Sequence, residues 1–343
     1  MSRVFIIAEA GVNHNGDESL AMRLIEIAAS CGADAIKFQT FSADKLVVKG
    51  TAKATYQARE TGIGDQHSML RALEMSDVSH LRIAEACGQQ GIEFMSTPFD
   101  ECAAEMLLDL GMRRIKVPSG ELTNLPFLRF LAGKRVPLII STGMADMEEV
   151  HLAVKEVKAV WSRIGYPNSP NGLTVLHCTS NYPAEFSDVN LFAMQSICKE
   201  VGVNVGYSDH TLGIAVSTAA VALGAKVIEK HFTLDKSLTG PDHSTSLNPD
   251  ELKALVDSIR VVEQCLGSTT KSPTSSELPI RDLVRRSVTL LRDFEADETI
   301  GSEDVALMRP GSGIQPADIN RVLGRQTRHA LTVGTTLKWS DLK

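Results

Sequence analysis

Short apolar runs rich in β-branched residues recur along the first part of the chain, and segments with helical periodicity separate them. The runs are continuously apolar rather than alternating, which is typical of parallel strands covered on both faces. The predicted strands are Val4–Ala10, Ala35–Thr40, Glu93–Thr97, Arg114–Pro118, Leu138–Ser141, Leu173–Cys178, Val203–Tyr207 and Lys226–His231. Eight strand–helix units predict an α/β fold with a closed (β/α)8 barrel, because a doubly wound sheet usually has fewer units.

The segments between these strands carry the signals of helix starts and stops. The predicted helices include Ser19–Cys31, Ser76–Gln90, Glu101–Leu110, Met147–Ile164 and Ile214–Leu223. Their expected N-caps are Asp17, Ser76, Asp100 and Asp146, and glycines 32, 91, 111 and 224 stand where a helix must turn into the next strand. The longest connection, Phe41–Met75, shows no clear period, and loops of this length are commonly lids or binding loops.

The last part of the chain differs in character from the first. Lys271–Glu277 is a linker rich in Ser, Thr and Pro, and a strand at Ser287–Leu291 precedes short turn-rich segments. One spacing occurs twice there, in Thr299-Ile300 with Asp304-Val305 and in Thr336-Leu337 with Asp341-Leu342. We therefore predict a barrel domain at 1–270, a linker at 271–282 and a small domain at 283–343. A core of this size is small, so docking of this domain on a barrel is expected.

The amino-acid composition limits the class of protein to which this chain can belong. A hydrophobic fraction of 43% and a charged fraction of 22% are ordinary for a soluble globular protein. No apolar run approaches the ~20 residues of a membrane span, and Phe5–Ile7 is too short for a signal peptide. Six cysteines without a CxxC pair indicate a reduced, cytoplasmic protein. A formal charge of -7 argues against a nucleic-acid partner, so any phosphate must be bound by locally placed groups.

Polar side chains stand at the carboxyl end of every predicted strand, where a (β/α) barrel builds its active site. They are Glu9, Lys37, Gln39, Thr97, Lys116, Ser119, Glu121, Ser141, Thr142, Thr179, Ser180, His210 and His231. Two lysines with several hydroxyls suit a small anion that carries a phosphate and a carboxylate. Taken singly, each Ser or Thr would more often cap a helix, and each lysine would more often be a solvated strand end. The prediction therefore depends on their convergence.

His210 and His231 end two successive predicted strands, and such a pair can hold one divalent ion with positions left open for substrate. A buried histidine is more often a hydrogen-bonded core residue than a metal ligand. The neighbouring Asp209 and Glu229 favour the metal, because carboxylates can orient an imidazole from outside the coordination sphere. Asp242 is either a loop stabiliser or an acceptor for a sugar hydroxyl, and the sequence leaves both open.

Several motifs together closely resemble the sialic acid synthase family. They are IAEAGVNHNG (Ile7–Gly16), IKFQT (Ile36–Thr40), STPFD (Ser96–Asp100), IKVPSGE (Ile115–Glu121), ISTGM (Ile140–Met144), LHCTSNYP (Leu176–Pro183), YSDHT (Tyr207–Thr211), EKHFT (Glu229–Thr233) and GPDH (Gly240–His243). MRPGSGI (Met308–Ile314) is similar to the signature of that family's C-terminal antifreeze-like (SAF) domain. The resemblance covers essentially the whole chain and implies a TIM barrel followed by a small β-clip domain. It also implies condensation of phosphoenolpyruvate with an N-acetylmannosamine-type sugar to a nine-carbon 2-keto acid and phosphate.

The resemblance also implies roles for individual residues. His210 and His231 would hold a divalent metal, with Mn²⁺ expected and Mg²⁺ or Co²⁺ as alternatives. The phosphoenolpyruvate site would be lined by Lys37, Thr97, Lys116, Ser119, Ser141 and Ser180. The sugar would contact Glu9, Gln39, Tyr182 and Asp242. Glu121, Glu9 and Lys116 are the expected catalytic residues, with Glu121 assisting proton transfer or activating water. The family forms a domain-swapped homodimer, in which Arg309 would reach the sugar bound in the partner's barrel. Ser180-Asn181 departs from the commonest pattern of the family.

Three questions stay open at this level. A Schiff-base aldolase on the same barrel would use Lys37 or Lys116 as its nucleophile. A second alternative is an independent ligand- or ice-binding C-terminal module on an inactive barrel, which the complete set of polar strand ends disfavours. The sugar is either N-acetylmannosamine or 2,4-diacetamido-2,4,6-trideoxymannose. By resemblance, the variant AEAGVNHNG (Ala8–Gly16) and the sequence of the Phe41–Met75 connection favour the latter, a legionaminate precursor, and a pseudaminate-type substrate fits less well.

Overall fold

The computed structural model describes residues 3–167 and 172–343. Its internal contacts divide the chain into two compact units, Met1–Gly267 and Ser268–Lys343. No helix within the described ranges combines the length and apolar character that are needed to cross a membrane.

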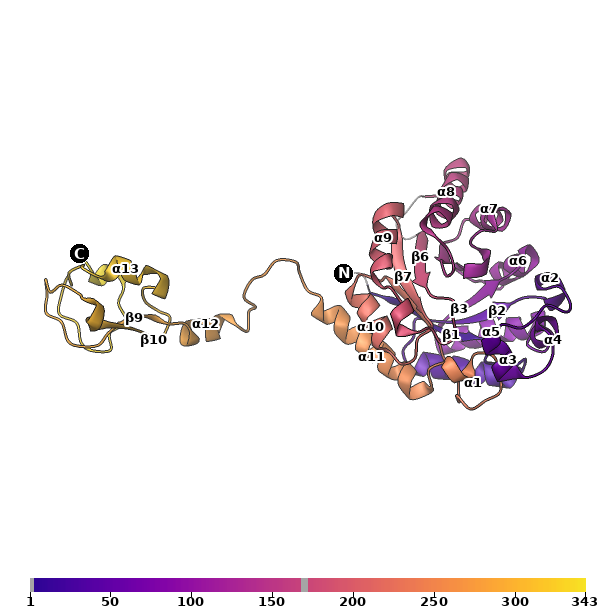
Figure 1. The fold of residues 1–343 in the computed structure, drawn as a ribbon, viewed down its shortest axis with the longest axis horizontal. Helices are drawn as coiled ribbons and strands as arrows, with labels where there is room; N and C mark the ends of the chain where they lie inside the picture. Colours follow the sequence, from indigo (N-terminus) through magenta and orange to yellow (C-terminus); the bar gives the residue numbers. More distant parts are fainter. Residues whose placement is uncertain (1–2, 168–171) are drawn as a thin grey trace. The chain divides into compact units, whose positions relative to one another are not determined.

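The first unit is built on eight parallel strands in the order β3-β2-β1-β8-β7-β6-β5-β4 (Figure 1). They are β1 (Phe5–Gly11), β2 (Ala35–Thr40), β3 (Glu93–Pro98), β4 (Ile115–Val117), β5 (Leu138–Ser141), β6 (Leu173–Cys178), β7 (Asn204–Asp209) and β8 (Val227–His231). The end strands β3 and β4 also lie next to each other, so the sheet is a nearly closed barrel. All eight predicted strands are confirmed, with ends that differ by one or two residues at most.

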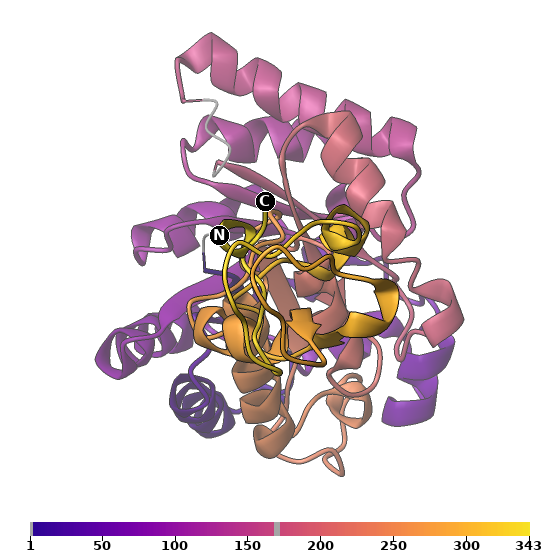
Figure 2. The same ribbon diagram turned by 90° about the vertical axis from the view of Figure 1, so that its left-hand side faces the viewer.

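Helices lie outside the strands, as both views of the ribbon show (Figures 1 and 2). They are α1 (Glu18–Ser30), α5 (Asp77–Gln90), α6 (Glu101–Asp109), α7 (Leu125–Gly133), α8 (Met147–Ile164), α9 (Phe192–Val201), α10 (Ala215–Ala222) and α11 (Pro249–Cys265). Each of the four predicted N-cap side chains accepts a backbone N–H of its helix, as Asp100 does from Ala103 at 2.9 Å. The predicted helix starts are therefore confirmed with their physical cause.

The connection Phe41–Met75 is not an irregular loop throughout, so this part of the prediction was wrong. It contains three short helices, α2 (Ala43–Leu46), α3 (Thr55–Thr61) and α4 (Gln66–Arg71). Helices of one or two turns are too short to produce a detectable hydrophobic period. We call the segment Phe41–Met75 the lid.

The interior of the barrel has two layers, because alternate residues of each strand point inward. The apolar layer comprises Ile7, Ala35, Met95, Ile139, Leu176 and Val227. Gly206 of β7 lies at this level, where a Cβ atom would overlap the Val227 carbonyl and the Leu176 side chain. Two residues further along several strands the inward side chains become polar. The apolar layer thus closes one end of the barrel, and the polar layer lies at the carboxyl ends of the strands.

The second unit has its own small core. Strands β9 (Ser287–Leu290) and β10 (Val305–Met308) pair antiparallel, and two short helices, α12 (Leu278–Val284) and α13 (Ile319–Val322), belong to the same unit. Its core comprises Val288, Leu290, Phe294, Ile300, Val305, Ile314, Val322, Leu337 and Leu342. The strand predicted at Ser287–Leu291 is confirmed to within one residue.

The repeated spacing in this unit corresponds to a repeated turn. Ile300 and Leu337 are fully buried, and each precedes a single 3-10 turn, at Ser302–Asp304 and at Trp339–Asp341. The aspartate that ends each turn accepts a backbone N–H three residues earlier, at 2.8 Å in both cases. The two stretches therefore share a spacing because both bury one apolar residue immediately before a carboxylate-capped turn.

Candidate active site

Five strands place a charged and hydroxyl-bearing cluster inside the barrel, above the apolar layer. Glu9, Lys37, Thr97, Lys116 and Glu229 are all buried. The Lys37 ammonium lies 2.8 Å from a Glu9 carboxylate oxygen, donates to the Thr97 hydroxyl at 2.8 Å, and lies 3.7 Å from Glu229. The Lys116 ammonium lies 3.6 Å from the other oxygen of Glu229. The two lysines that the sequence singled out are therefore brought together around one carboxylate.

The pKa values of the charged groups in this cluster are shifted in different directions. Burial by itself would lower the pKa of Lys37, but Glu229 and Glu9 outweigh it and raise the pKa above its ordinary value. Burial prevails at Lys116, where it lowers the pKa although Glu229 opposes it. Burial would raise the pKa of Glu229, but Lys116 and Lys37 hold it at about 2. At Glu9 burial prevails over Lys37 and raises the pKa to about 7. Glu9 can therefore take up or release a proton near neutral pH.

Glu229 is the residue whose role the sequence analysis missed. The sequence indicates Glu229 only as a neighbour of His231. In the structure Glu229 joins Lys37 to Lys116 and accepts a hydrogen bond from the Ser208 hydroxyl at 2.9 Å. The alternation of side chains along a strand could have revealed this role, because Glu229 and His231 are two residues apart and both point into the barrel. Ser208 and His210 are related in the same way.

Hydroxyl groups border the cluster on the side of β4, β5 and β6. The Gly143 backbone N–H donates to the Ser119 hydroxyl at 2.9 Å, and a Cβ atom on Gly143 would overlap the Ser180 hydroxyl and crowd Ser119 and Cys178. Two of the predicted phosphoenolpyruvate residues, Ser119 and Ser180, thus meet at this point. The Ser141 hydroxyl is buried and has no hydrogen-bond partner within residues 3–167 and 172–343. A buried hydroxyl without a partner is a ready donor for a bound anion.

His210 and His231 lie side by side, with ring centroids 5.7 Å apart. The Nδ1–H of His210 donates to the Thr179 carbonyl at 2.7 Å, which leaves the Nε2 lone pair free. Nδ1 of His231 is buried without a hydrogen-bond partner in the described part of the chain, and lies 4.0 Å from an Asp242 carboxylate oxygen. Burial lowers the pKa of both imidazoles, and the neighbouring His210 lowers the pKa of His231 further.

These observations fit a divalent metal ion. Neutral imidazoles carry the lone pairs that a metal needs, and metal–nitrogen bonds of about 2.1 Å allow one ion to reach both rings. Within the described residues there is no cluster of three or more His, Cys, Asp and Glu side chains suited to a metal. A site of two imidazoles would leave most coordination positions for substrate and water.

Asp209, the carboxylate next to His210 in the sequence, does not orient that imidazole, so this part of the prediction was wrong. Glu229 accepts from Ser208 and lies beside the two lysines. Asp209 forms a fully buried ion pair with Lys230 at 2.8 Å and accepts from Ser217 at 2.6 Å. Because neighbours along a strand point to opposite faces, Asp209 faces the helix layer while the imidazoles face the barrel. A backbone carbonyl fixes His210, and Asp242 of the loop that follows β8 approaches His231.

The predicted sugar-binding residues collect around the imidazole pair. Tyr182 packs its ring against His210 at a centroid distance of 4.2 Å and meets His231 edge-on at 5.7 Å. A Cβ atom on Gly11, whose φ is +53°, would lie 3.3 Å from Glu9, 3.3 Å from the His231 ring and 3.5 Å from Gln39. The left-handed conformation and this crowding both require glycine. Burial raises the pKa of Asp242 to about 6, so this carboxyl can also change protonation near neutral pH.

Glu121 lies at the edge of this group, in the 3-10 turn Ser119–Glu121. Its carboxylate accepts from the Asn124 side chain at 2.7 Å, close to the start of α7. Within the described residues it forms no hydrogen bond or ion pair with the lysines or imidazoles. Of the predicted catalytic residues, Glu9 and Lys116 belong to the buried cluster, whereas Glu121 is half-exposed beside Ser119.

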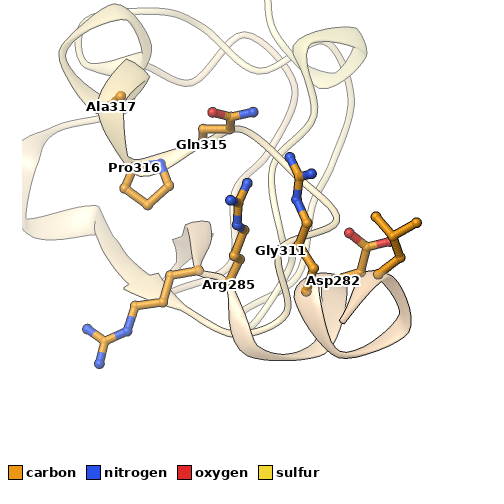
Figure 3. Close-up of a pocket in the computed structure, with 9 residues that line it drawn as sticks. Asp282, Arg285, Gly311, Gln315, Pro316 and Ala317 are labelled. Carbon is orange, nitrogen blue, oxygen red and sulfur yellow. The ribbon is translucent and has the colours of Figure 1, made fainter. Parts of the chain in front are cut away.

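The C-terminal unit has a separate cavity of about 580 Å³ between α12 and the loop after β10. Figure 3 shows Asp282, Arg285, Gly311 and Gln315 around it. Arg309 is exposed and does not line this cavity. Arg309 is therefore free to contact another surface.

A nearly closed eight-stranded barrel with this buried cluster at the carboxyl ends of its strands defines a barrel enzyme. The model of the NeuB family matches residues 24–271, and that of the SAF domain matches residues 285–343. The chain belongs to the NeuB family and carries a C-terminal SAF domain.

Individual relatives agree with this assignment. The chain is 53% identical to the N,N'-diacetyllegionaminic acid synthase of Legionella pneumophila over 99% of this chain and 94% of that protein. It is 43% identical to the N,N'-diacetyllegionaminic acid synthase of Campylobacter jejuni over 95% of this chain and 96% of that protein. The crystal structure of an N-acetylneuraminic acid (sialic acid) synthetase from Leptospira borgpetersenii, in complex with citrate, superimposes with a TM-score of 0.71. That structure is 33% identical and covers 81% of this chain and 90% of its own.

Proposed function

We propose that the protein condenses phosphoenolpyruvate with an acylated six-carbon amino sugar to give a nonulosonic acid and phosphate. The observation that carries this proposal is the buried Lys37–Glu229–Lys116 cluster beside two neutral imidazoles. The lysines supply positive charge for an enol phosphate in a chain whose net charge is -7. Membership of the NeuB family supports the same reaction.

The sugar that we propose is 2,4-diacetamido-2,4,6-trideoxymannose, with N,N'-diacetyllegionaminate as product. Two relatives that match nearly the whole chain, at 53% and 43% identity, are N,N'-diacetyllegionaminic acid synthases. N-acetylmannosamine is the second candidate, because the Leptospira relative is a sialic acid synthetase.

The phosphoenolpyruvate site that we propose lies between the lysines and the Gly143 turn. Lysine ammonium groups act as point charges, and hydroxyls and backbone N–H groups donate to the phosphate and carboxylate oxygens. The proposed ligands are Lys37, Thr97, Lys116, Ser119, Ser141 and Ser180. The Ser141 hydroxyl without a partner supports this location. All these donors are fixed before substrate arrives, so little reorganisation is needed as charge develops.

His210 and His231 are the proposed ligands of a divalent metal, with Mn²⁺ preferred. When bound, this metal would act as a Lewis acid on the aldehyde oxygen of the open-chain sugar. Gln39, Tyr182, Asp242 and Glu9 would orient the sugar around it. The tight packing of Tyr182 on His210 supports a role for that ring in aligning the aldehyde.

The proposed reaction forms one C–C bond and one C–O bond to water, and it breaks the C–O bond to phosphate, while the aldehyde oxygen takes up a proton to become a hydroxyl. The methylene carbon of phosphoenolpyruvate attacks the sugar aldehyde, and positive charge develops at the carbon that bears the phosphate. Water adds to that carbon and gives up a proton to a carboxylate, either Glu121 or Glu9. The tetrahedral intermediate then expels inorganic phosphate and leaves the 2-keto group. The pKa of about 7 at Glu9 suits a group that must accept and release a proton.

Phosphate release tests the reaction directly. The purified protein with Mn²⁺ and phosphoenolpyruvate is assayed against the diacetamido sugar, N-acetylmannosamine and the pseudaminate precursor. We expect the highest kcat/KM with the diacetamido sugar, and loss of activity when His210 or His231 is replaced by Ala or the metal is removed. Full activity of the metal-stripped protein would refute the role of the imidazoles.

Borohydride trapping with pyruvate separates this reaction from a Schiff-base aldolase. The lowered pKa of Lys116 makes it the better nucleophile of the two lysines, whereas Lys37 is held protonated. We expect no covalent adduct, and an adduct on Lys116 would favour the aldolase.

We further propose a domain-swapped homodimer in which the SAF domain, at 283–343, places Arg309 over the sugar in the partner's barrel. The exposure of Arg309 supports this. Mixing His231→Ala chains with Arg309→Ala chains tests it, since only a swapped heterodimer has one complete site. We expect about a quarter of wild-type activity from the mixture. No recovery would show that Arg309 acts within its own chain.

The six cysteines are all free thiols, and a reducing compartment, the cytoplasm, is the proposed location.

A further inference from the structure

An aromatic stack connects the lid to the imidazole pair. Tyr56 of α3 stacks on Tyr182 with a centroid distance of 5.1 Å and an angle of 28° between the rings. Tyr182 in turn packs on His210 at 4.2 Å. Tyr56 is thus one ring further from the imidazoles than Tyr182, and it is the lid residue that reaches toward the predicted sugar site.

The lid helix α3 is not anchored by a core of its own. No residue of α3 is fully buried, and the neighbouring Ile63 is entirely exposed. The hydrogen bonds around this helix are local, such as Lys53 to the Thr61 hydroxyl at 2.8 Å. A cavity of about 380 Å³ separates the lid from the loop at Thr239–Pro241. The tyrosine stack is therefore a specific contact between a weakly packed segment and the barrel centre.

Tyr56 presents a flat apolar ring face and a neutral hydroxyl group. Burial and the charge of Asp242 raise its pKa, so the phenol stays protonated and can donate a hydrogen bond. A ring face of this kind packs well against methyl groups, whereas its contact with hydroxyl groups contributes little binding energy.

The direction of the sugar follows from the site. In the proposed site the aldehyde lies at the imidazoles beside Tyr182, so carbons 4 to 6 extend away from them. Tyr56 is the next ring beyond Tyr182 and is within reach of that end of the sugar. In the diacetamido sugar C4 carries an acetamido group, which ends in a methyl, and C6 is itself a methyl group. In N-acetylmannosamine the same positions carry hydroxyls.

We propose that Tyr56 is a specificity-determining residue that packs against the 4-acylamino and 6-deoxy end of the sugar. It favours a 2,4-diacylamino-2,4,6-trideoxy sugar over N-acetylmannosamine. This inference rests on the proposed synthase function.

Steady-state kinetics with both sugars tests the inference in the full-length protein with Mn²⁺. We expect Tyr56→Ala to raise the KM for the diacetamido sugar and to lower its kcat/KM relative to N-acetylmannosamine about tenfold, as for loss of packing on one or two methyl groups. The KM for phosphoenolpyruvate should stay within about twofold, because Tyr56 stacks on Tyr182 and not on a residue proposed to bind phosphoenolpyruvate. Tyr56→Phe keeps the ring and should keep the preference.

Arg59→Ala is the matched control, because Arg59 lies on the exposed side of the same helix and should leave the preference unchanged. A preference unchanged in Tyr56→Ala would overturn the inference. An equal rise in the KM of both sugars and of phosphoenolpyruvate would also overturn it, since that is the pattern of a damaged lid. If the wild-type protein releases phosphate with neither sugar, the proposed function itself fails and this inference falls with it.

Discussion

At the scale of single residues, the position of Glu229 between two lysines has a direct consequence. Glu229→Gln keeps the shape but removes the charge that both ammonium groups face. Two buried lysines would then share only Glu9, and Lys116 would release its proton more readily. We expect kcat/KM for phosphoenolpyruvate to fall about 100-fold, which corresponds to ~2.7 kcal/mol.

Ser208→Ala serves as a graded comparison, because it removes one hydrogen bond to Glu229 and no charge. Its loss should be about tenfold or less. Unchanged phosphate release by Glu229→Gln would show that the lysines do not depend on this carboxylate.

Gly143 offers a second prediction at this scale. In Gly143→Ala the new methyl group would overlap the Ser180 hydroxyl and crowd Ser119, so both hydroxyls must move. We expect the KM for phosphoenolpyruvate to rise about tenfold or more, measured by phosphate release. Gly120→Ala is the control, because nothing lies within 4 Å of the added atom. Equal kinetics for the two variants would contradict this packing.

At the scale of elements, helix α5 contains two glycines that should respond in opposite ways. Gly88 is exposed within the helix and has open space around it, so Gly88→Ala should stabilise the protein by about 0.5–1 kcal/mol. Gly91 is the C-cap with φ of +69°, so Gly91→Ala should destabilise by about 1 kcal/mol. Urea unfolding measures both. A change in the free energy of unfolding of the same sign in both variants would mean that α5 does not end at Gly91.

The elements also differ in how well the sequence predicts them. The sequence predicts the strands and long helices correctly, because continuous apolar runs and N-cap residues such as Asp146 are local signals. The three short lid helices escaped prediction, since each has too few turns to repeat a pattern. The lid accordingly contains the contact, Tyr56 on Tyr182, that periodicity could not anticipate.

At the scale of the whole molecule, buried neutral imidazoles predict acid sensitivity. Burial is the main reason that the pKa values of His14 and His243 fall from 6.5 to about 4. Between these values the unfolded chain binds more protons than the folded one. These two imidazoles therefore lower the free energy of unfolding as pH drops through this window. Glu9 and Asp242 act in the opposite direction, because their raised pKa values make the folded protein bind protons in the same range.

At pH 5 each of these imidazoles should cost about 2 kcal/mol relative to pH 7. Urea unfolding at both pH values checks this, and His243→Gln should reduce the loss by about that amount. His151→Gln, at an exposed position on α8, should not change it. A stability difference between pH 5 and pH 7 that is the same in the wild type and in His243→Gln would contradict the burial of His243.

The sequence by itself determined the alternation of strands and helices, the barrel, the C-terminal unit and the edge at which the polar residues gather. These properties depend on local signals: apolar runs, caps, glycines and the period of two within each strand. Lys37, Lys116, His210 and His231 were found in this way, because every parallel strand brings its carboxyl end to the same face.

Only the tertiary structure decided which of these side chains touch. It made Glu229 the partner of both lysines, turned Asp209 away to Lys230, and folded the loop after β8 so that Asp242 approaches His231. The physical reason is that pairing between strands depends on register and on loops that close across the barrel. A residue's neighbours in space are set by those long-range contacts, which no pattern along one strand records.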